Sequence, residues 1–124
     1  MNNKIVLIDD DEDILDVIQY ILVDEGYNVA VYDNLQPLEK IIEQQPCVIL
    51  LDNKLANAYS NTLCLALKSN YRTKHIPVIL MSAAEDLEQI AKACNADAFL
   101  NKPFELKEFI KLVKHYSAIF NALL

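Results

Sequence analysis

The sequence has 124 residues, 53% of them hydrophobic, and a formal net charge of -7 at pH 7. A chain of this length forms a single domain that can bury a core without disulfide or metal staples. No apolar run approaches the roughly 18 residues of a membrane span, which argues against a transmembrane protein, and the negative charge argues against a nucleic-acid-binding surface of clustered Lys and Arg.

The first part of the chain predicts a strand followed by a helix. Met1–Lys4 lacks the basic start, apolar middle and cleavage site of a secretory signal, so we expect a cytoplasmic protein. Lys4–Ile8 is an apolar run typical of a buried strand, and three aspartates follow it. From Glu12 the apolar residues have helical spacing, and Gly26 is placed to end that helix. The apolar stripe consists of Ile14, Leu15, Val17, Ile18, Ile21 and Leu22.

The middle of the chain predicts a second strand, a second helix and a central strand. Asn28–Tyr32 is a short β-favouring run. A helix follows around Leu38, Ile41 and Ile42, with Asn34 as its expected N-cap and Pro37 in its first turn. In Cys47–Asp52, five apolar residues lead directly into a carboxylate, as in a strand covered on both faces.

The remaining residues continue the alternation of helices and strands after a polar loop at 53–61. The predicted elements are a helix at Leu63–Leu67, a strand at Ile76–Met81 that ends in Ser82, a helix at Leu87–Cys94, a strand at Ala98–Leu100 and a helix from Leu106 to Phe120.

This alternation predicts the fold class. Five strands alternating with five helices are typical of an α/β protein with a doubly wound parallel sheet and helices on both faces, here one domain spanning residues 1–124. Cys47, Cys64 and Cys94 form no Cys-x-x-Cys pair and lie in apolar segments, so we expect neither a disulfide nor a zinc site.

Polar residues follow four of the predicted strands. They are Asp9, Asp10 and Asp11 after the first strand, Asp52 after the third, Ser82 after the fourth and Lys102 after the fifth. Because the carboxyl ends of parallel strands lie at one rim of the sheet, we expect these side chains to converge. Clustered carboxylates repel one another unless a cation lies among them, and Mg²⁺ prefers such oxygen ligands.

These residue types suggest phosphoryl transfer to Asp52. An aspartate can form an acyl phosphate, Mg²⁺ can neutralise charge, and a lysine such as Lys102 commonly binds phosphate oxygens. Each residue also has a purely structural interpretation. The first three aspartates could cap the first helix, Asp52 could start a turn and Ser82 could be an N-cap. Lys102 could lie in a solvated loop, and Phe99 could belong to the core.

The motifs resemble the response regulator receiver domain of two-component signalling. The matching segments are Ile5–Asp11, Val48–Asp52, His75–Ala83 and Ala96–Phe104. The resemblance implies a flavodoxin-like sheet with strand order 2-1-3-4-5. It also implies Asp52 as phosphoacceptor and metal ligand, Asp10 as a direct Mg²⁺ ligand, Asp9 as a ligand through water, Lys54 as a ligand through its backbone carbonyl, Lys102 as the phosphoryl-binding cation and Ser82 as its hydrogen-bond donor.

Other features follow from the same resemblance. Phe99 matches an aromatic residue that rotates inward on phosphorylation and changes the face made by the fourth helix, fifth strand and fifth helix. The Lys102–Pro103 bond is expected to be cis. The loop after Asp52 departs from the family, because Leu55-Ala56 replaces Met-Pro and Ser60 stands where glycine is usual, so we expect the turn at Asn57 or Asn61. Asn95 also stands where glycine is usual.

We therefore expect a non-enzymatic switch, a phosphoacceptor with self-catalysed phosphotransfer and slow autodephosphorylation. Its partners would be a sensor histidine kinase or histidine phosphotransfer protein and a downstream protein, not nucleic acid or a membrane. The alternatives are a binding or dimerisation module without phosphorylation and an aspartate-nucleophile phosphatase. In the latter class a second acid stands two residues after the nucleophile, where this chain has Lys54. The apolar tail Tyr116–Leu124 suggests a homodimer or a docked partner.

Overall fold

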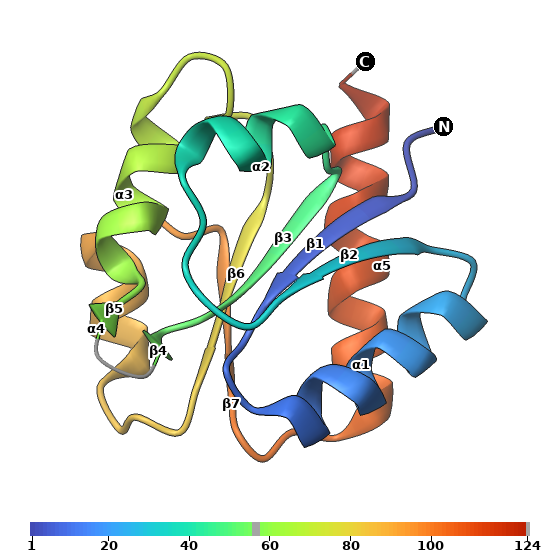
Figure 1. The fold of residues 1–124 in the computed structure, drawn as a ribbon, viewed down its shortest axis with the longest axis horizontal. Helices are drawn as coiled ribbons and strands as arrows, with labels where there is room; N and C mark the ends of the chain where they lie inside the picture. The colour runs from blue at the N-terminus through green and yellow to red at the C-terminus, as the bar shows by residue number, and fades with distance from the viewer. Residues whose placement is uncertain (56–57, 124) are drawn as a thin grey trace.

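The computed structural model describes residues 1–55 and 58–123, and for residues 54, 55, 58 and 59 it describes the backbone only. Its main sheet has five parallel strands, with the order β2-β1-β3-β6-β7 (Figure 1). This is the predicted order 2-1-3-4-5 in a flavodoxin-like sheet, which is confirmed. The strands are β1 (Lys4–Ile8), β2 (Asn28–Tyr32), β3 (Val48–Asp52), β6 (Val78–Ser82) and β7 (Ala98–Asn101).

Helices cover both faces of this sheet. They are α1 (Glu12–Asp24), α2 (Leu38–Gln44), α3 (Asn61–Ser69), α4 (Leu87–Ala93) and α5 (Leu106–Ala122). Crossover connections between parallel strands are right-handed. The chain adds β2 on one side of β1 and then β3, β6 and β7 in turn on the other side. The helix α1 therefore lies on one face of the sheet, and α2, α3 and α4 lie on the other. An ion pair of 2.8 Å between Lys114 of α5 and Glu25 at the end of α1 joins the two helices of the first face.

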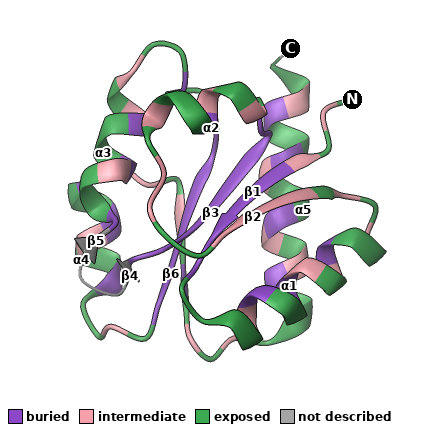
Figure 2. Ribbon diagram, viewed as in Figure 1, coloured by how far each residue is buried: buried purple, intermediate pink, exposed green. Residues whose placement is uncertain are grey.

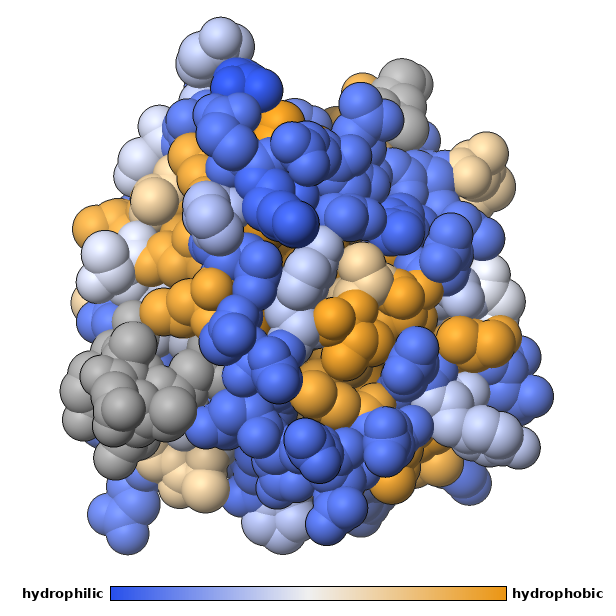
Figure 3. All heavy atoms as spheres, in the orientation of Figure 1, coloured by the Kyte–Doolittle hydropathy of each residue, from blue (hydrophilic) through white to orange (hydrophobic). Residues whose placement is uncertain are grey.

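The central strands form the core. Every residue of β3 and of β6 is buried, which explains why their sequences are unbroken apolar runs (Figure 2). The edge strand β2 is mostly half-buried, and Figure 3 shows apolar side chains on the face where β2 lies. Cys47, Cys64 and Cys94 are buried free thiols, as predicted. Among the described residues, no helix combines the length and apolar character needed to cross a bilayer.

Two helix ends test the capping predictions. Gly26 has φ +96° just beyond the end of α1, a conformation that glycine adopts without a Cβ penalty. The predicted cap at Asn34 is wrong, because α2 begins after Pro37 as N-cap and has no side-chain cap. The Oδ1 of Asn34 instead accepts a hydrogen bond of 2.6 Å from Gln36 within the preceding loop.

The segment predicted as a loop after Asp52 contains a small antiparallel hairpin, β4 (Lys54–Leu55) with β5 (Ala58–Tyr59). The prediction of a turn at Asn61 is wrong, because this residue begins α3; Asn57 lies outside the described residues. Ser60 has φ -80°, which any residue adopts, so this position does not require a glycine. Asn95 has φ +62°, as its place at a usual glycine suggested, and Gln45 has an unexpected φ of +49°.

The two ends of the chain lie together at the amino-terminal edge of the sheet (Figure 1). The backbone N–H of Asn2 donates to Oδ1 of Asn121 over 2.8 Å, and Nδ2 of Asn121 donates to the Asn2 carbonyl over 2.9 Å. In the apolar tail, Phe120 is buried and stacks on the exposed ring of His75, whereas Leu123 is exposed.

Candidate functional site

Three carboxylates converge at the carboxyl-terminal rim of the sheet. Asp9 and Asp10 follow β1, and Asp52 is the last residue of β3. One oxygen atom from each lies within 4.8 Å of the others. Asp9 has no exposed surface and Asp52 is 7% exposed, so water screens their repulsion poorly. This oxygen-rich donor set fits a hard divalent cation such as Mg²⁺.

Asp11, the third aspartate of the run, has a different place. Its Oδ1 accepts hydrogen bonds from the backbone N–H groups of Asp13 and Ile14, at 3.1 and 3.3 Å, and so caps α1. Asp9 supports this turn, because its Oδ1 accepts a hydrogen bond of 3.0 Å from the Asp11 N–H. The capping interpretation of the run therefore holds for Asp11, while Asp9 and Asp10 belong to the carboxylate cluster.

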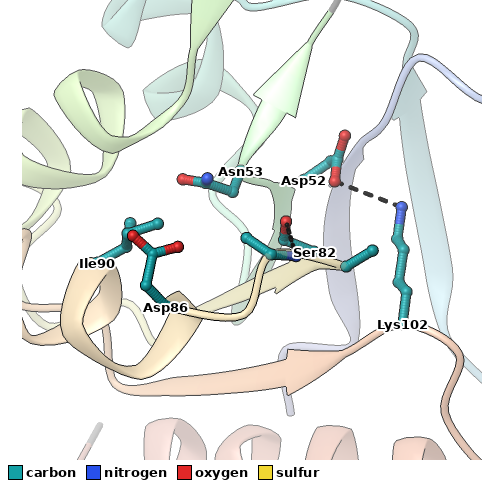
Figure 4. A pocket seen from close by; sticks show the side chains of 8 residues that line it. Asp52, Asn53, Ser82, Asp86, Ile90 and Lys102 are labelled. Atoms are coloured by element: carbon teal, nitrogen blue, oxygen red, sulfur yellow. Dashed lines mark hydrogen bonds and ion pairs between the residues drawn. The ribbon is translucent and has the colours of Figure 1, made fainter.

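Lys102, which follows β7, points into this cluster (Figure 4). Its Nζ donates to Oδ2 of Asp9 over 2.6 Å and to Oδ1 of Asp52 over 3.3 Å. Burial acts to lower the pKa of Lys102, but the hydrogen bond to Asp9 and the charge of Asp52 outweigh it, so the pKa is raised. The Lys102–Pro103 bond is cis, as the resemblance implied.

The carboxyl group of Asp52 has a raised pKa. Burial raises its pKa from 3.8 to about 6, with the charge of Asp9 adding to the effect and Lys102 opposing it. The net rise means that the ammonium group of Lys102 does not outweigh the combined effect of burial and the neighbouring carboxylates on the pKa of Asp52. A second cation would lower this electrostatic cost and keep the carboxylate ionised.

Ser82, the last residue of β6, lies beside Asp52 in the same cavity. It is 7% exposed, and its Oγ accepts a hydrogen bond of 3.1 Å from the Ala84 N–H. The interpretation of Ser82 as N-cap of the next helix is wrong, because the N-cap of α4 is Asp86. The cavity has a volume of about 560 Å³. Its lining residues are Asp52, Asn53, Ser82, Ala83, Ala84, Asp86, Ile90 and Lys102.

Two residues at this rim were not predicted from the sequence. The hydroxyl of Ser60, which is fully buried, donates to the backbone carbonyl of Asp52 and so holds the end of β3. Asn53 is 3% exposed and lines the cavity with its side chain. The only available signal for Asn53 was its position, directly after a strand that ends in a functional aspartate.

The structure places the two other predicted residues as follows. The backbone of Lys54 pairs with Tyr59 in the β4–β5 hairpin, and its side chain lies outside the described part of the chain. Phe99 of β7 is 37% exposed, so its interpretation as a core residue is wrong. Its neighbour in the strand, Leu100, is the residue that packs into the core.

Comparisons with known proteins agree with this geometry. Residues 5–114 match the family model of the response regulator receiver domain. A CheY-like receiver domain protein from Methanospirillum hungatei is similar over 100% of both chains, with 22% identity and a TM-score of 0.88. Chemotaxis protein CheY4 of Vibrio cholerae has 22% identity and a TM-score of 0.83, covering 94% of this chain and 99% of its own. The beryllofluoride-activated NtrC4 receiver domain dimer has 26% identity and a TM-score of 0.83, covering 95% and 98%.

Proposed function

Because this chain belongs to the response regulator receiver domain family, we propose that it is a phosphoryl-accepting switch of two-component signalling, with Asp52 as the phosphoacceptor. The observation that carries the proposal is the contact of Lys102 Nζ with Asp52 Oδ1 at 3.3 Å, inside a cluster of three carboxylates. This arrangement supplies a nucleophilic oxygen, a fixed cation and a place for a second cation.

Receiver domains bind Mg²⁺ at an acidic pocket, and the carboxylate cluster is the corresponding set here. We assign Asp10 and Asp52 as direct ligands, Asp9 as a ligand through water, and the backbone carbonyl of Lys54 as a further ligand. Bound Mg²⁺ would neutralise negative charge on the transferring phosphoryl group. The ammonium of Lys102 would bind a phosphoryl oxygen, which requires it to exchange part of its contact with Asp9.

Ser82 and Phe99 connect the phosphorylated site with the surface. The Ser82 hydroxyl lines the same cavity as Asp52 and is free to rotate its proton toward a phosphoryl oxygen while still accepting from Ala84. That change would draw the start of the α4 segment toward Asp52. Phe99, which is exposed on the neighbouring strand β7, would then rotate inward and change the surface formed by α4, β7 and α5.

Receiver domains in two-component systems act between histidine kinases and downstream targets. For this chain we propose a sensor histidine kinase or histidine phosphotransfer protein as phosphodonor, a downstream protein as target, and a cytoplasmic location. The NtrC4 receiver domain, at 26% identity, is a dimer, which supports a homodimer here. The exposed tail residues Ile119 and Leu123 offer apolar surface for such a contact.

Two other functions are less well supported. A binding module without phosphorylation would not need Asp10, Asp52, Ser82 and Lys102 together at one rim. A phosphatase of the aspartate-nucleophile class would need an acid two residues after Asp52, where the chain has Lys54.

The test is intact mass spectrometry after incubation with Mg²⁺ and acetyl phosphate. We expect one adduct of about 80 Da that is alkali-labile, as an acyl phosphate is. The adduct should be absent in Asp52→Ala and present in Asp33→Ala, in which an exposed aspartate that belongs neither to the carboxylate cluster nor to the cavity lining is removed. An adduct that survives in Asp52→Ala, or no adduct on the wild-type chain, would overturn the assignment.

A further inference from the structure

A second cavity lies at the pole of the molecule opposite to the carboxyl-terminal rim of the sheet. Figure 1 shows α2, the connection from α3 to β6 and the end of α5 together at this pole, and side chains from all three line one cavity of about 590 Å³. Its buried lining residues Pro46, Ile76 and Phe120 are apolar, whereas its exposed lining residues are polar or aromatic. An apolar floor with a few polar groups at the margin is typical of a small-molecule site.

A tightly bonded turn carries the cationic side of this cavity. Thr73 is 1% exposed, and its hydroxyl donates to the Leu67 carbonyl over 2.7 Å, which anchors the turn between α3 and β6. The Oδ1 of Asn70 accepts a hydrogen bond of 2.8 Å from the Arg72 N–H, and the Asn70 carbonyl accepts one of 2.8 Å from the Lys74 N–H. These bonds fix the backbone from which Arg72 projects, so less order has to be gained when a ligand binds there.

Arg72 makes this margin of the cavity a place for an anion. Its guanidinium group donates to the Glu39 carboxylate over 3.1 Å, but the two side chains are 42% and 69% exposed, so this ion pair contributes little and can exchange with a ligand. No Asp or Glu lines the cavity, and the exposed Lys74 adds positive charge to the same turn. The carboxylates of the rim lie beyond the length of a strand, about 15 Å or more, and salt screens their repulsion over a Debye length of about 8 Å.

The cavity also has rings on which a planar group can stack. Tyr71 is 79% exposed, and the ring of His75 stacks on Phe120 with centroids 5.7 Å apart and planes at 22°. Because His75 is exposed while Phe120 is buried, this stack ends in a ring whose outer face is open to solvent. Nucleobases stack on such rings whatever their identity.

Gln45 brings an amide group to the cavity from an unusual backbone position. Its φ of +49° lies in the left-handed region, where glycine or asparagine is the ordinary residue, and non-glycine residues held there cluster at ligand sites. The Asn2 Nδ2 donates to the Gln45 carbonyl over 2.7 Å and helps to hold this conformation. In the described part of the chain, the Gln45 side-chain amide makes no hydrogen bond. An amide offers a donor and an acceptor together, the pattern that matches an edge of adenine.

We propose that this cavity binds a nucleoside monophosphate. Arg72 binds the phosphate through two parallel hydrogen bonds, which displaces Glu39 into solvent. The base stacks on the rings of Tyr71 and His75, and the Gln45 amide contacts its edge. Binding involves no covalent step and does not depend on Asp52, so this ligand site is a function beyond the proposed phosphoryl switch.

The experiment titrates the isotope-labelled chain with adenosine monophosphate, in buffer free of magnesium and of phosphate, and follows the backbone amide resonances. Without magnesium, the carboxylate cluster does not recruit the phosphate group. Saturable shifts are expected at Gln45, Tyr71, Arg72 and Ile76, with a Kd below about 5 mM. Adenosine and ribose phosphate each carry one half of the ligand, so each should bind at least about tenfold more weakly.

Two substitutions at one ion pair should change the affinity in opposite directions. Arg72→Gln removes the guanidinium group and should raise the Kd about tenfold, the effect of one charge-assisted hydrogen bond. Glu39→Gln releases Arg72 from its partner and should lower the Kd about threefold. Tyr71→Ala should raise the Kd about tenfold through the loss of stacking, whereas Tyr71→Phe keeps the ring and the wild-type affinity. All three positions are exposed, so these variants should fold.

The charge-matched controls are Lys111→Gln and Glu108→Gln, which alter exposed residues of α5 outside the cavity lining. Their Kd should equal that of the wild type. No shift at about 10 mM ligand, or shifts confined to Ser82, Ala84 and Lys102 at the rim, would overturn the site. Equal Kd values for Arg72→Gln and Lys111→Gln would overturn it as well. None of these outcomes bears on the phosphorylation of Asp52, which the mass measurement tests separately.

Discussion

The ammonium group of Lys102 lies 2.6 Å from Oδ2 of Asp9, a carboxylate with no exposed surface. The side chain of Lys102 is itself only 17% exposed, so this pair is shielded from water. Replacing Lys102 by Met would leave the buried carboxylate of Asp9 without its cationic partner. We expect a loss of about 3 kcal/mol in the free energy of unfolding, measured by urea denaturation in magnesium-free buffer.

The control for this prediction is Lys114→Met, which breaks the exposed ion pair with Glu25 and should change stability little. Adding Mg²⁺ should return part of the stability of Lys102→Met, because the metal ion then neutralises Asp9 and Asp52. Equal losses in the two lysine variants would contradict the importance of the buried pair.

Asp52 should make the stability of the metal-free protein depend on pH. Its pKa is raised from 3.8 to about 6 in the folded protein. Between these values the folded protein retains a proton that the unfolded chain has released, so the free energy of unfolding decreases as the pH rises. Asp52→Asn removes this effect. The free energy of unfolding of Asp52→Asn minus that of the wild type should therefore increase by about 2 kcal/mol from about pH 4 to about pH 7.5.

Denaturation curves of both proteins at the two pH values, in the presence of a chelator, measure this difference. Asp33→Asn, which alters an exposed aspartate, controls for the change in net charge. The prediction fails if the two variants show the same pH dependence relative to wild type.

Asp10 and Asp11 should differ in their effect on magnesium binding. Asp10 contributes to the carboxylate cluster, whereas Asp11 caps α1 through its Oδ1. Ligand binding to the folded state raises the melting temperature. We expect Mg²⁺ to raise the melting temperature of wild type and of Asp11→Asn, in which the new asparagine still caps the helix, but much less that of Asp10→Asn. Similar loss of the magnesium effect in both variants would refute the division of roles.

Ala84 should limit the rate at which the aspartyl phosphate is hydrolysed. It lines the cavity next to Ser82 and has no polar side-chain atom to orient an attacking water. Ala84→Asn adds an amide there, so we expect the phosphoryl lifetime to shorten by about tenfold, the effect of one added hydrogen bond. Intact mass after removal of the donor follows the decay. Ala84→Leu, of similar size but apolar, is the control, and equal lifetimes in the two variants would exclude water positioning.

Much of the sheet and of its polar rim could be predicted from the sequence, because both depend on local patterns. Apolar runs covered on both faces mark β1, β3 and β6, and parallel strands bring their carboxyl ends to one rim. The predicted strand at Ile76–Met81 began early, because Ile76 and Pro77 are buried but precede the first strand residue, Val78. The N-cap at Asn34 failed because a capping residue type does not fix where a helix begins.

The residues missed at the site depend on contacts across the fold. Ser60 reaches the carbonyl of Asp52 only through the path of the β4–β5 hairpin, which residue types do not specify. The buried Oδ1 of Asn53 has no hydrogen-bond partner among the described residues, which is visible only when every neighbouring donor is placed. For Phe99 the residue type was misleading. An aromatic residue on a strand suggested the core, but β7 is an edge strand with one solvated side, and Phe99 is exposed there.

The hydrogen bonds between Asn2 and Asn121 have a practical consequence. They hold both chain ends at the edge of the sheet farthest from the aspartate rim. A tether attached at either terminus, whether for surface immobilisation or for a fluorescent fusion, would leave the opposite pole of the molecule open to a docking protein. Either orientation of attachment should therefore report the same association kinetics.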